Sequence, residues 1–444
     1  MTAVAAPRTA AVERFVTAWR AAGTQPGPDW LRQLRGGALE QFEVLGFPGP
    51  RDEAWRFTSV APIVETPFDV AAPGAAVTAD ALRPFLVGQG AARHALVFVN
   101  GRFAPKLSAP GRLPAGVTVT SLSAAFTSHA DLVRAHLGRH TSSARHAFAA
   151  LNAAFLADGA LIHVGAGIEL DEPLQLLFVT AAGAARPAVH PRALIVVERA
   201  ARATVVETYA GLDPAAVSLT NAVTELVVND GARVDHYRIQ REAPAAYHVG
   251  VTHSHQGRDA VLHSTSVAFG AALARHDITA VLDGQGANLN LNGLSVAAGH
   301  QHLDHHTTID HAQPHGESHE LFNGVFDGRA HGVFTGRIIV RPGAQRTDSK
   351  QTNNNLLLSG EARADSQPQL EIYADDVKCT HGSTTGPLDP TALFYLKSRG
   401  LDPRAATGML TYGFGAEIVS RIAVEGVRAE LDKLLRERVA EAVR

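Results

Sequence analysis

The sequence contains very little cysteine, since Cys379 is the only thiol among 444 residues. A single thiol excludes a disulfide framework within the chain, and it excludes any metal site built from several thiolates of this chain alone. A reducing compartment is the simplest setting for such a chain, and we therefore expect a cytoplasmic protein.

Targeting and nucleotide-binding signals are also missing. The first 14 residues have no continuous apolar segment, and no run of about 18 uncharged apolar residues occurs, so we expect neither a signal peptide nor a membrane span. No Gly-Lys dipeptide exists, which excludes the phosphate loop G-x-x-x-x-G-K-[ST], and neither G-x-G-x-x-G nor G-x-S-x-G is present. The chain should not hydrolyse ATP by itself.

The chain has no large excess of charge of either sign. With 40 basic and 43 acidic residues the formal net charge is −3, too close to balance to indicate capture of nucleic acid or of an anionic membrane. Hydrophobic residues make up 45% and charged residues 19%, which is typical of globular proteins. The length suggests two or three domains.

Short β-branched segments fill the middle of the sequence after Gly159. Gly231, Gly257 and Gly284 mark turns that are 26 and 27 residues apart, a period that suits one coil of a β-solenoid. Residues 288–292 alternate asparagine with leucine, as expected of a strand whose polar face stacks on neighbouring coils. We therefore favour a parallel β-helix over a β-sandwich. The predicted early strands are 161–164, 174–179, 193–198, 204–209, 223–228 and 233–239.

Helical patterns flank this region on both sides. Apolar spacing predicts helices over 9–23, over 28–43 with a break at Gly36 and Gly37, over 122–137 and over 143–156. Near the C-terminus, Asp389 and Pro390 begin a predicted helix whose apolar face carries Leu393, Phe394 and Leu396, and an amphipathic helix is predicted over 425–443.

The expected domains are a helical or mixed region at 1–158, a solenoid core at 159–386 and a helical region at 387–444. The ends of a solenoid carry unpaired strand edges, so we expect the helical regions to cap them. All three tryptophans lie within the first 55 residues, where we expect them to pack in the small N-terminal helical part.

Histidine is concentrated between His236 and His331, which holds 14 of the 22, and 300–319 alone holds seven. Clustered imidazoles favour a divalent metal site, and a stand-alone metal hydrolase using His302, His305 and His311 is one alternative. In a strand, however, alternate histidines face opposite sides, and Pro314 interrupts a helix. Polar side chains along the outside of stacked strands are the favoured interpretation.

The second chemical candidate is Cys379 with His381. These residues lie two apart, so in a strand they share a face, where a thiolate and an imidazole offer two ligands to iron. Two ligands do not complete a coordination shell, and the remaining positions then fall to another chain.

Three segments resemble the SufB/SufD family of iron-sulfur cluster assembly proteins, and its SufD members most. They are R-T-D-S-K-Q-T-N-N-N-L-L-L-S at 346–359, L-E-I-Y-A-D-D-V-K-C-T-H-G at 370–382 and L-F-Y-L-K-S-R-G-L at 393–401. Further likeness lies in P-R-D-E-A-W-R-F-T at 50–58 and F-A-A-L-N-A-A-F-L-A-D-G at 148–159. SufB-type chains are usually richer in cysteine, which favours the SufD side.

The resemblance implies a right-handed parallel β-helix flanked by helical regions, within a complex of SufB, SufC and SufD. It implies that SufC, the family's ATPase, docks on residues 387–444, where Phe394, Tyr395, Leu396 and Arg399 are the expected contacts. It also implies that SufB pairs through the β-helix and that His381, with Cys379 beside it, faces a SufB cysteine used for cluster assembly, His381 being the expected metal ligand.

On this reading the chain is a non-catalytic scaffold subunit. It holds no tightly bound cofactor, only a transient iron or iron-sulfur cluster shared with SufB, and a homodimer is possible when the chain is alone. The alternative from another class is a β-helix enzyme acting on polysaccharide, with the histidine-rich strands as its cleft.

Overall fold

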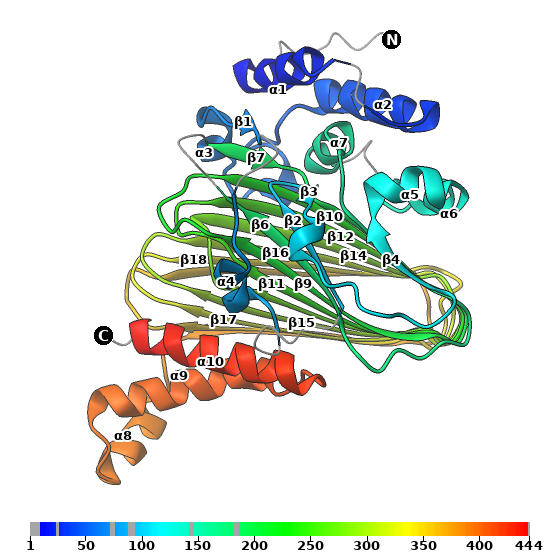
Figure 1. The fold of residues 1–444 in the computed structure, drawn as a ribbon. Coiled ribbons are helices and arrows are strands. Elements are labelled where there is room, and N and C mark those ends of the chain that lie inside the picture. Colours follow the sequence, from blue (N-terminus) through cyan, green and yellow to red (C-terminus); the bar gives the residue numbers. More distant parts are fainter. Residues whose placement is uncertain are drawn as a thin grey trace.

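The computed structural model describes residues 9–23, 26–71, 76–87, 94–141, 146–181 and 186–442. Two sheets of mainly parallel strands face each other and are crossed alternately by the chain, forming a β-solenoid of about eight coils (Figure 1). The predicted fold class, mainly β with flanking helices, is confirmed.

The first sheet runs in the order β20 (Arg363–Ile372), β18 (His331–Val340), β16 (His302–His311), β14 (Leu273–Leu282), β12 (Tyr247–Gln256), β10 (Leu219–Val228), β8 (Arg192–Val197), β5 (Ala160–Val164) and β4 (Val117–Ser121), with β1 (Asp69–Val70) and β7 (Pro187–Val189) at its side. The second sheet runs in the order β21 (Lys378–Gly386), β19 (Asp348–Leu357), β17 (Glu317–Phe326), β15 (Asn288–Ala297), β13 (Val261–Ala268), β11 (Arg233–Arg241), β9 (Arg202–Gly211), β6 (Leu174–Thr180), β2 (Ala95–Val99) and β3 (Arg102–Phe103).

The repeat that the sequence spacing indicated is present, but its length varies along the stack. Arg233 lies opposite Val261, and Val261 lies opposite Asn288, giving repeats of 28 and 27 residues. Gly231 and Gly286 both adopt a positive φ, whereas Gly257 and Gly284 do not. Gly284 instead lies against the turn of the preceding coil, where a Cβ atom would be 2.0 Å from the Arg258 nitrogen. Gly231 therefore occupies a different position in its turn from Gly257 and Gly284.

The core lies between the two sheets and is formed by alternate residues of each strand. Its apolar part includes Phe98, Ile195, Leu289 and Ile338, all buried. Polar side chains share this interior, among them His236 and Glu320. Parallel strands that are covered on both faces bury nearly every residue, as β10 does here.

The flanking helices cover the outer faces of the two sheets, which differs from the predicted caps at the solenoid ends. Phe148 and Leu151 of α7 (Ala147–Ala154) belong to an apolar cluster with Leu219 and Val249 of the first sheet. On the second sheet, outward Tyr237 belongs to a cluster with helices α9 (Pro403–Val419) and α10 (Glu425–Ala442). Figure 1 shows the two helical groups on opposite sides of the solenoid.

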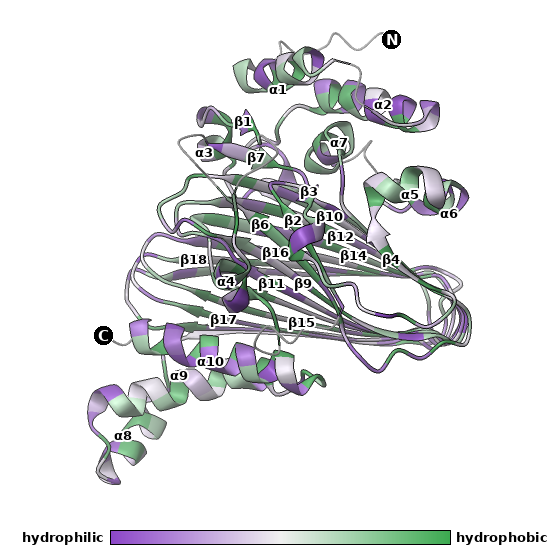
Figure 2. Ribbon diagram, viewed as in Figure 1, coloured by the Kyte–Doolittle hydropathy of each residue, from purple (hydrophilic) through white to green (hydrophobic). Residues whose placement is uncertain are grey.

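The outward-facing strand residues explain this position. Because both faces of each sheet are apolar over much of their length, helices are needed along the sides of the stack. Figure 2 shows hydrophobic and hydrophilic residues side by side along α10, whose apolar face is turned to the second sheet.

Helix boundaries agree in part with the sequence pattern. The helix predicted over 9–23 is α1 (Ala10–Ala21), and Asp389 caps α8 (Pro390–Ser398) by accepting a hydrogen bond from the Thr391 amide. The break predicted at Gly36 and Gly37 is wrong, since α2 (Asp29–Leu45) is continuous.

The two helices predicted between residues 122 and 156 are present in shorter form. The helix predicted over 122–137 is divided at His129 into α5 (Leu122–Ser128) and α6 (Ala130–His136). The helix predicted over 143–156 is α7, and residues 143–145 lie outside the described residues. The remaining short elements are η1 (Glu53–Trp55), α3 (Ala61–Glu65), α4 (Ala79–Leu82), η2 (Arg83–Phe85) and η3 (Pro105–Leu107).

The two ends of the solenoid differ. At one end, the short strands β3 and β4 pair antiparallel with β2 and β5. At the other end, β20 and β21 each have a single strand neighbour, so one edge of each is unpaired by any described strand. Ile372 and Tyr373 at this end are 41% and 61% exposed. We call this the open end of the solenoid. In the part of the chain that the model describes, no helix has the length and apolar character needed to cross a membrane.

Burial of histidine gives the fold a defined sensitivity to acid. Burial lowers the pKa of His190 to about 3, and lowers the pKa values of His253, His302, His305 and His311 to about 4. Between about pH 6.5 and pH 4 the unfolded chain therefore binds more protons than the folded chain, and stability falls as the pH falls.

We predict that the chain unfolds cooperatively between about pH 4.5 and pH 5.5, because each such histidine removes roughly 3–5 kcal/mol on full titration. The substitution His305→Gln, which keeps a hydrogen-bonding group beside Ser295, should lower the midpoint, as measured by circular dichroism. His263→Gln on the exposed outer face is the matched control. A wild-type midpoint below pH 4 would contradict the prediction.

Candidate functional site at the open end of the solenoid

Cys379 and His381 lie on β21, the last strand of the second sheet. In the register with β19, Cys379 lies opposite Ser349 and His381 lies opposite Gln351. Ser349 and Gln351 are both buried inside the solenoid. Because paired parallel strands turn matching side chains to the same face, Cys379 and His381 both face the interior at the open end.

The two side chains differ in their surroundings. Cys379 is half-buried and packs against the end of the apolar core with Leu370 and Val377. Burial, assisted by the Asp348 carboxylate, raises the pKa of the Cys379 thiol. The thiol is therefore protonated at neutral pH and must release its proton before it binds a metal. His381 is exposed, and it is the more accessible ligand of the two.

The rim around these residues is polar. Ser383 Oγ donates a hydrogen bond to Ser366 Oγ at 2.8 Å and so joins β21 to β20. Two residues further along β21, Thr385 Oγ1 accepts a hydrogen bond at 3.3 Å from Asn355 Nδ2 of β19. Within the described ranges, no group of three or more histidine, cysteine or acidic side chains is arranged to hold a metal ion.

The histidines of 300–319 do not form a single site. His305 and His311 of β16 point into the solenoid, where they lie 3.2 Å from Ser295 Oγ and 2.9 Å from Ser318 Oγ. His302 lies on the opposite face of β16, 2.9 Å from Thr58 Oγ1. The alternative of a hydrolase metal site formed by these three histidines is therefore wrong. The expectation that the cluster lines the outside of the strands is also wrong for His305 and His311.

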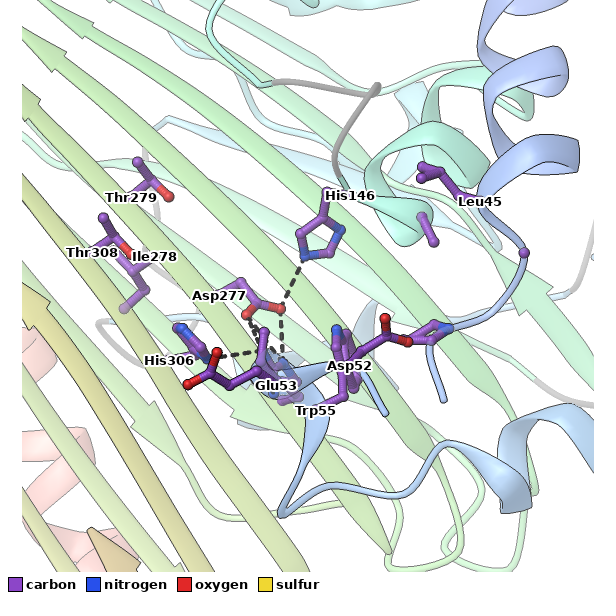
Figure 3. Close-up of a pocket in the computed structure, with 15 residues that line it drawn as sticks. Leu45, Asp52, Glu53, Trp55, His146, Asp277, Ile278, Thr279, His306 and Thr308 are labelled. Carbon is purple, nitrogen blue, oxygen red and sulfur yellow. Dashed lines mark hydrogen bonds and ion pairs between the residues drawn. The ribbon is translucent and has the colours of Figure 1, made fainter. Parts of the chain in front are cut away.

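A cavity of about 400 Å³ lies elsewhere, between residues 45–55 and the outer face of the first sheet (Figure 3). The Arg275 guanidinium lies 3.9 Å from the centre of the Trp55 ring, and it donates to the Ala54 carbonyl and to Asp304 at 2.7 Å each. Figure 3 shows His146 directed at Asp277, with 3.1 Å between His146 Nε2 and Asp277 Oδ2.

These contacts show that the 50–58 motif attaches the N-terminal region to the first sheet. Burial favours the neutral acid at Asp277, but Arg275 and His146 outweigh it and hold the pKa of Asp277 well below its usual range. Thr58 Oγ1 donates to Asp304 Oδ2 at 2.5 Å. Arg275, Asp277 and His146 in the wall of the cavity are thus paired with each other, and the contacts of Arg275 and Asp304 fix the N-terminal region to the first sheet.

The residues expected to contact an ATPase lie on α8. Phe394 and Tyr395 are 72% and 55% exposed, and the Arg399 guanidinium lies 5.1 Å from the centre of the Tyr395 ring. Leu396 is partly buried. Next to α8, a groove of about 790 Å³ between α9 and α10 is lined by apolar residues such as Met409 and by the charged residues Asp402, Arg404 and Arg436. Among the described residues, the apolar face predicted for α8 is therefore only partly covered, with Phe394 left exposed.

Comparison with known proteins adds to this geometry. Residues 178–414 match the family model for the SUF system FeS cluster assembly SufBD core domain, and residues 17–176 match that of the SufBD protein N-terminal region. The chain belongs to the SufBD family. It is 33% identical to an iron-sulfur cluster assembly SufBD family protein from Synechocystis, over 90% of this chain and 89% of that protein.

SufBD relatives named SufD are similar over most of their length. The iron-sulfur cluster assembly protein SufD of Escherichia coli is 29% identical over 95% of each chain. That of Bacillus subtilis is 27% identical over 93% of this chain and 94% of the relative. The chain is thus an iron-sulfur cluster assembly protein of the SufBD family, and the resemblance found in its motifs is confirmed. The alternative of a polysaccharide-active enzyme has no support from the family.

Sequence reasoning missed several residues that the fold brings together. Arg275 binds the 50–58 segment from more than 200 positions away, and no local pattern indicates it. Gln351 lies between Glu320 and His381 in the register of the second sheet. A coil period of about 30 residues, had it been recognised at this end of the chain, would have aligned these three positions.

We predict that alkylation of Cys379 by iodoacetamide is slow at pH 7 and still accelerates above pH 9, because burial raises the pKa of the thiol. The chain has no other cysteine, so mass spectrometry of the intact protein reports this residue alone. Urea-unfolded chain is the control and should show the earlier plateau of an ordinary thiol. A folded-state plateau near pH 8 would contradict the prediction.

Proposed function

We propose that this chain is a non-catalytic scaffold subunit of a SufBCD-type complex. In this proposal it pairs with a SufB-like subunit at its open end, and it shares a transient iron or iron-sulfur cluster there. It docks a SufC-like ATPase on α8–α10, and it works in the cytoplasm. The observation that carries the proposal is the position of Cys379 and His381 on the last, singly paired strand of the stack.

The open end supports pairing with a second solenoid. An unpaired edge presents backbone N–H and C=O groups that a strand of another chain can satisfy. Here two such edges, those of β20 and β21, lie at the same end of the molecule. A SufB-like solenoid can continue both sheets at once, and a second copy of this chain is the partner expected when SufB is absent.

Coordination at this interface needs two chains. His381 and Cys379 supply at most two ligands, while a conventional cluster needs four. A partner that meets the open end brings its own side chains to the same interior face, and the cluster is then cargo held between the subunits. The raised pKa of the Cys379 thiol favours His381 as the first ligand at neutral pH.

The α8 surface supports the ATPase part of the proposal. The sequence lacks a phosphate loop, so the energy of ATP has to come from another subunit. Exposed aromatic residues such as Phe394 and Tyr395 are typical of interface anchors. Because α9 and α10 pack on the second sheet, movement of a docked ATPase has a direct mechanical route to the solenoid.

We expect His381→Ala to reduce the iron and acid-labile sulfide content of the co-expressed complex at least five-fold under anaerobic conditions, because the shared site loses its accessible ligand. Assembly of the subunits should be unchanged in size-exclusion chromatography. His263→Ala, an exposed outer-face histidine, is the matched control. Wild-type cluster content in the His381 variant would refute the role.

For the second surface, Phe394→Asp should abolish co-purification of the ATPase subunit, because a buried hot-spot aromatic contributes about 2 kcal/mol or more to binding. The SufB-like subunit should still co-purify. Val44→Asp changes an equally exposed apolar residue on α2 and should affect neither partner. Retention of the ATPase by the Phe394 variant would place its docking site elsewhere.

A further inference from the structure

Three side chains form a column at the open end of the solenoid. Glu320 on β17 lies opposite Gln351 on β19, and Gln351 lies opposite His381 on β21. Neighbouring strands of a sheet are about 4.8 Å apart, so these side chains occupy successive strands of one column. Glu320 and Gln351 are 2% and 0% exposed, while His381 ends the column in solvent.

The amide of Gln351 has a defined orientation in this column. Its Nε2 donates a hydrogen bond to Glu320 Oε2 at 2.7 Å. The amide oxygen Oε1 therefore points away from Glu320, and it is buried with no hydrogen-bond partner among the described residues. The facing residue on β18 is Gly336, where a Cβ atom would lie 2.2 Å from Gln351 Nε2. A larger residue at 336 would push on this amide and on the Phe334 ring, whose Cζ atom would lie 2.7 Å from the added Cβ atom.

Leaving a buried carbonyl oxygen without a hydrogen bond is unfavourable, so this oxygen readily accepts one from the next available donor. The next side chain of the column is His381. A neutral imidazole has one N–H donor and one lone-pair nitrogen, and the hydrogen bond made by the donor decides which nitrogen carries the lone pair. The same arrangement holds metal-binding histidines in many proteins.

We propose that Gln351, held in place by Glu320, accepts a hydrogen bond from a ring N–H of His381 and so fixes the tautomer of this histidine. The other ring nitrogen then presents its lone pair at the open end. Gln351 and Glu320 are positioning residues in this inference, because neither touches the cargo. The use of the lone pair for iron rests on the proposed function, whereas the hydrogen bond does not.

The protonation state of Glu320 bears on the orientation of the Gln351 amide. Burial raises the pKa of Glu320 to about 7, so both forms are populated near neutral pH. The groups that face it are Thr307 from the first sheet and Gln351 from its own sheet. The carboxylate can only accept, which leaves Gln351 Oε1 for His381, whereas the carboxylic acid can donate its O–H to Gln351 Oε1. The tautomer of His381 is therefore measured at about pH 8.5, where Glu320 is mainly ionised.

The test uses the full chain without metal, with its histidines labelled with ¹⁵N. Two-bond ¹H–¹⁵N correlation spectra distinguish the two neutral tautomers, and His381 is assigned by the loss of its signals in His381→Ala. We expect one tautomer to dominate in the wild-type chain. In Gln351→Leu, which fills the space without an acceptor, the tautomer ratio should change at least five-fold.

Two further variants separate a hydrogen bond from a packing effect. In Glu320→Gln the side chain at 320 gains an N–H donor that can bond to Gln351 Oε1, so the tautomer ratio should move toward that of Gln351→Leu. In the exchanged double variant E320Q/Q351E, a donor amide and an acceptor carboxyl are again neighbours, and the carboxyl at 351 should restore the single tautomer of His381. If Gln351→Leu fails to fold, the single variant Gly336→Ala takes its place in the comparison with the double variant. The added methyl group at 336 pushes on the Gln351 amide from the opposite sheet.

The outcomes are distinct from those of the proposed function. An unchanged tautomer ratio in Gln351→Leu or in Gly336→Ala overturns the inference, whatever the cluster content of the complex. A changed ratio supports it, even if the cluster content is unaffected by both Gln351→Leu and His381→Ala. In that last case the proposed function fails, while the hydrogen bond between Gln351 and His381 stands.

Discussion

In-register pairing of parallel strands is the constraint on which the rest of this structure depends. Each coil lies directly on the one before it, so a position on one strand is repeated on every strand of the sheet. Residues about 30 apart in sequence are thereby brought within one strand spacing of each other. The apolar core and the column that ends at His381 are both consequences of this single rule.

The same rule explains how the interior holds so many polar groups. Glu242 and His248 are both about 1% exposed, and the distance from His248 Nδ1 to Glu242 Oε1 is 2.7 Å. Gln240 Nε2 donates to the same carboxylate at 2.6 Å. A slip of one strand by one residue would turn these groups to the opposite face and separate them. The polar pairs therefore penalise wrong registers, while the apolar residues supply most of the driving force for folding.

Local pattern was sufficient for much of the fold. β-branched runs located β5, β6 and β8–β11, and capping at Asp389 located the start of α8. The break expected at Gly36 and Gly37 was wrong because packing of α2 outweighs the low helix propensity of two glycines. The helices were expected at the ends of the stack, but they cover its sides. The sequence shows which residues are apolar, but it does not show which of them, such as Tyr237, face outward and need a covering helix.

The candidate site was predictable only in part, for a related reason. Cys379 and His381 are two residues apart and share a face in any strand, so their spacing alone predicts that the two side chains lie on the same side. Gln351 and Glu320 depend on where β19 and β17 begin, and the register is fixed by turns whose lengths vary from coil to coil. The contact of Arg275 with residues 54 and 55 depends on how an entire N-terminal region docks, which no spacing in the sequence encodes.

The unequal ends of the solenoid have a consequence for how large an assembly can grow. One end offers two singly paired strands of nine and ten residues, whereas the other finishes in antiparallel strands, one of them only two residues long. If two such molecules join through their open ends, only the ends with antiparallel strands face outward. A pair formed in this way would have no second open end to extend, so the geometry that favours one partner also disfavours a fibre.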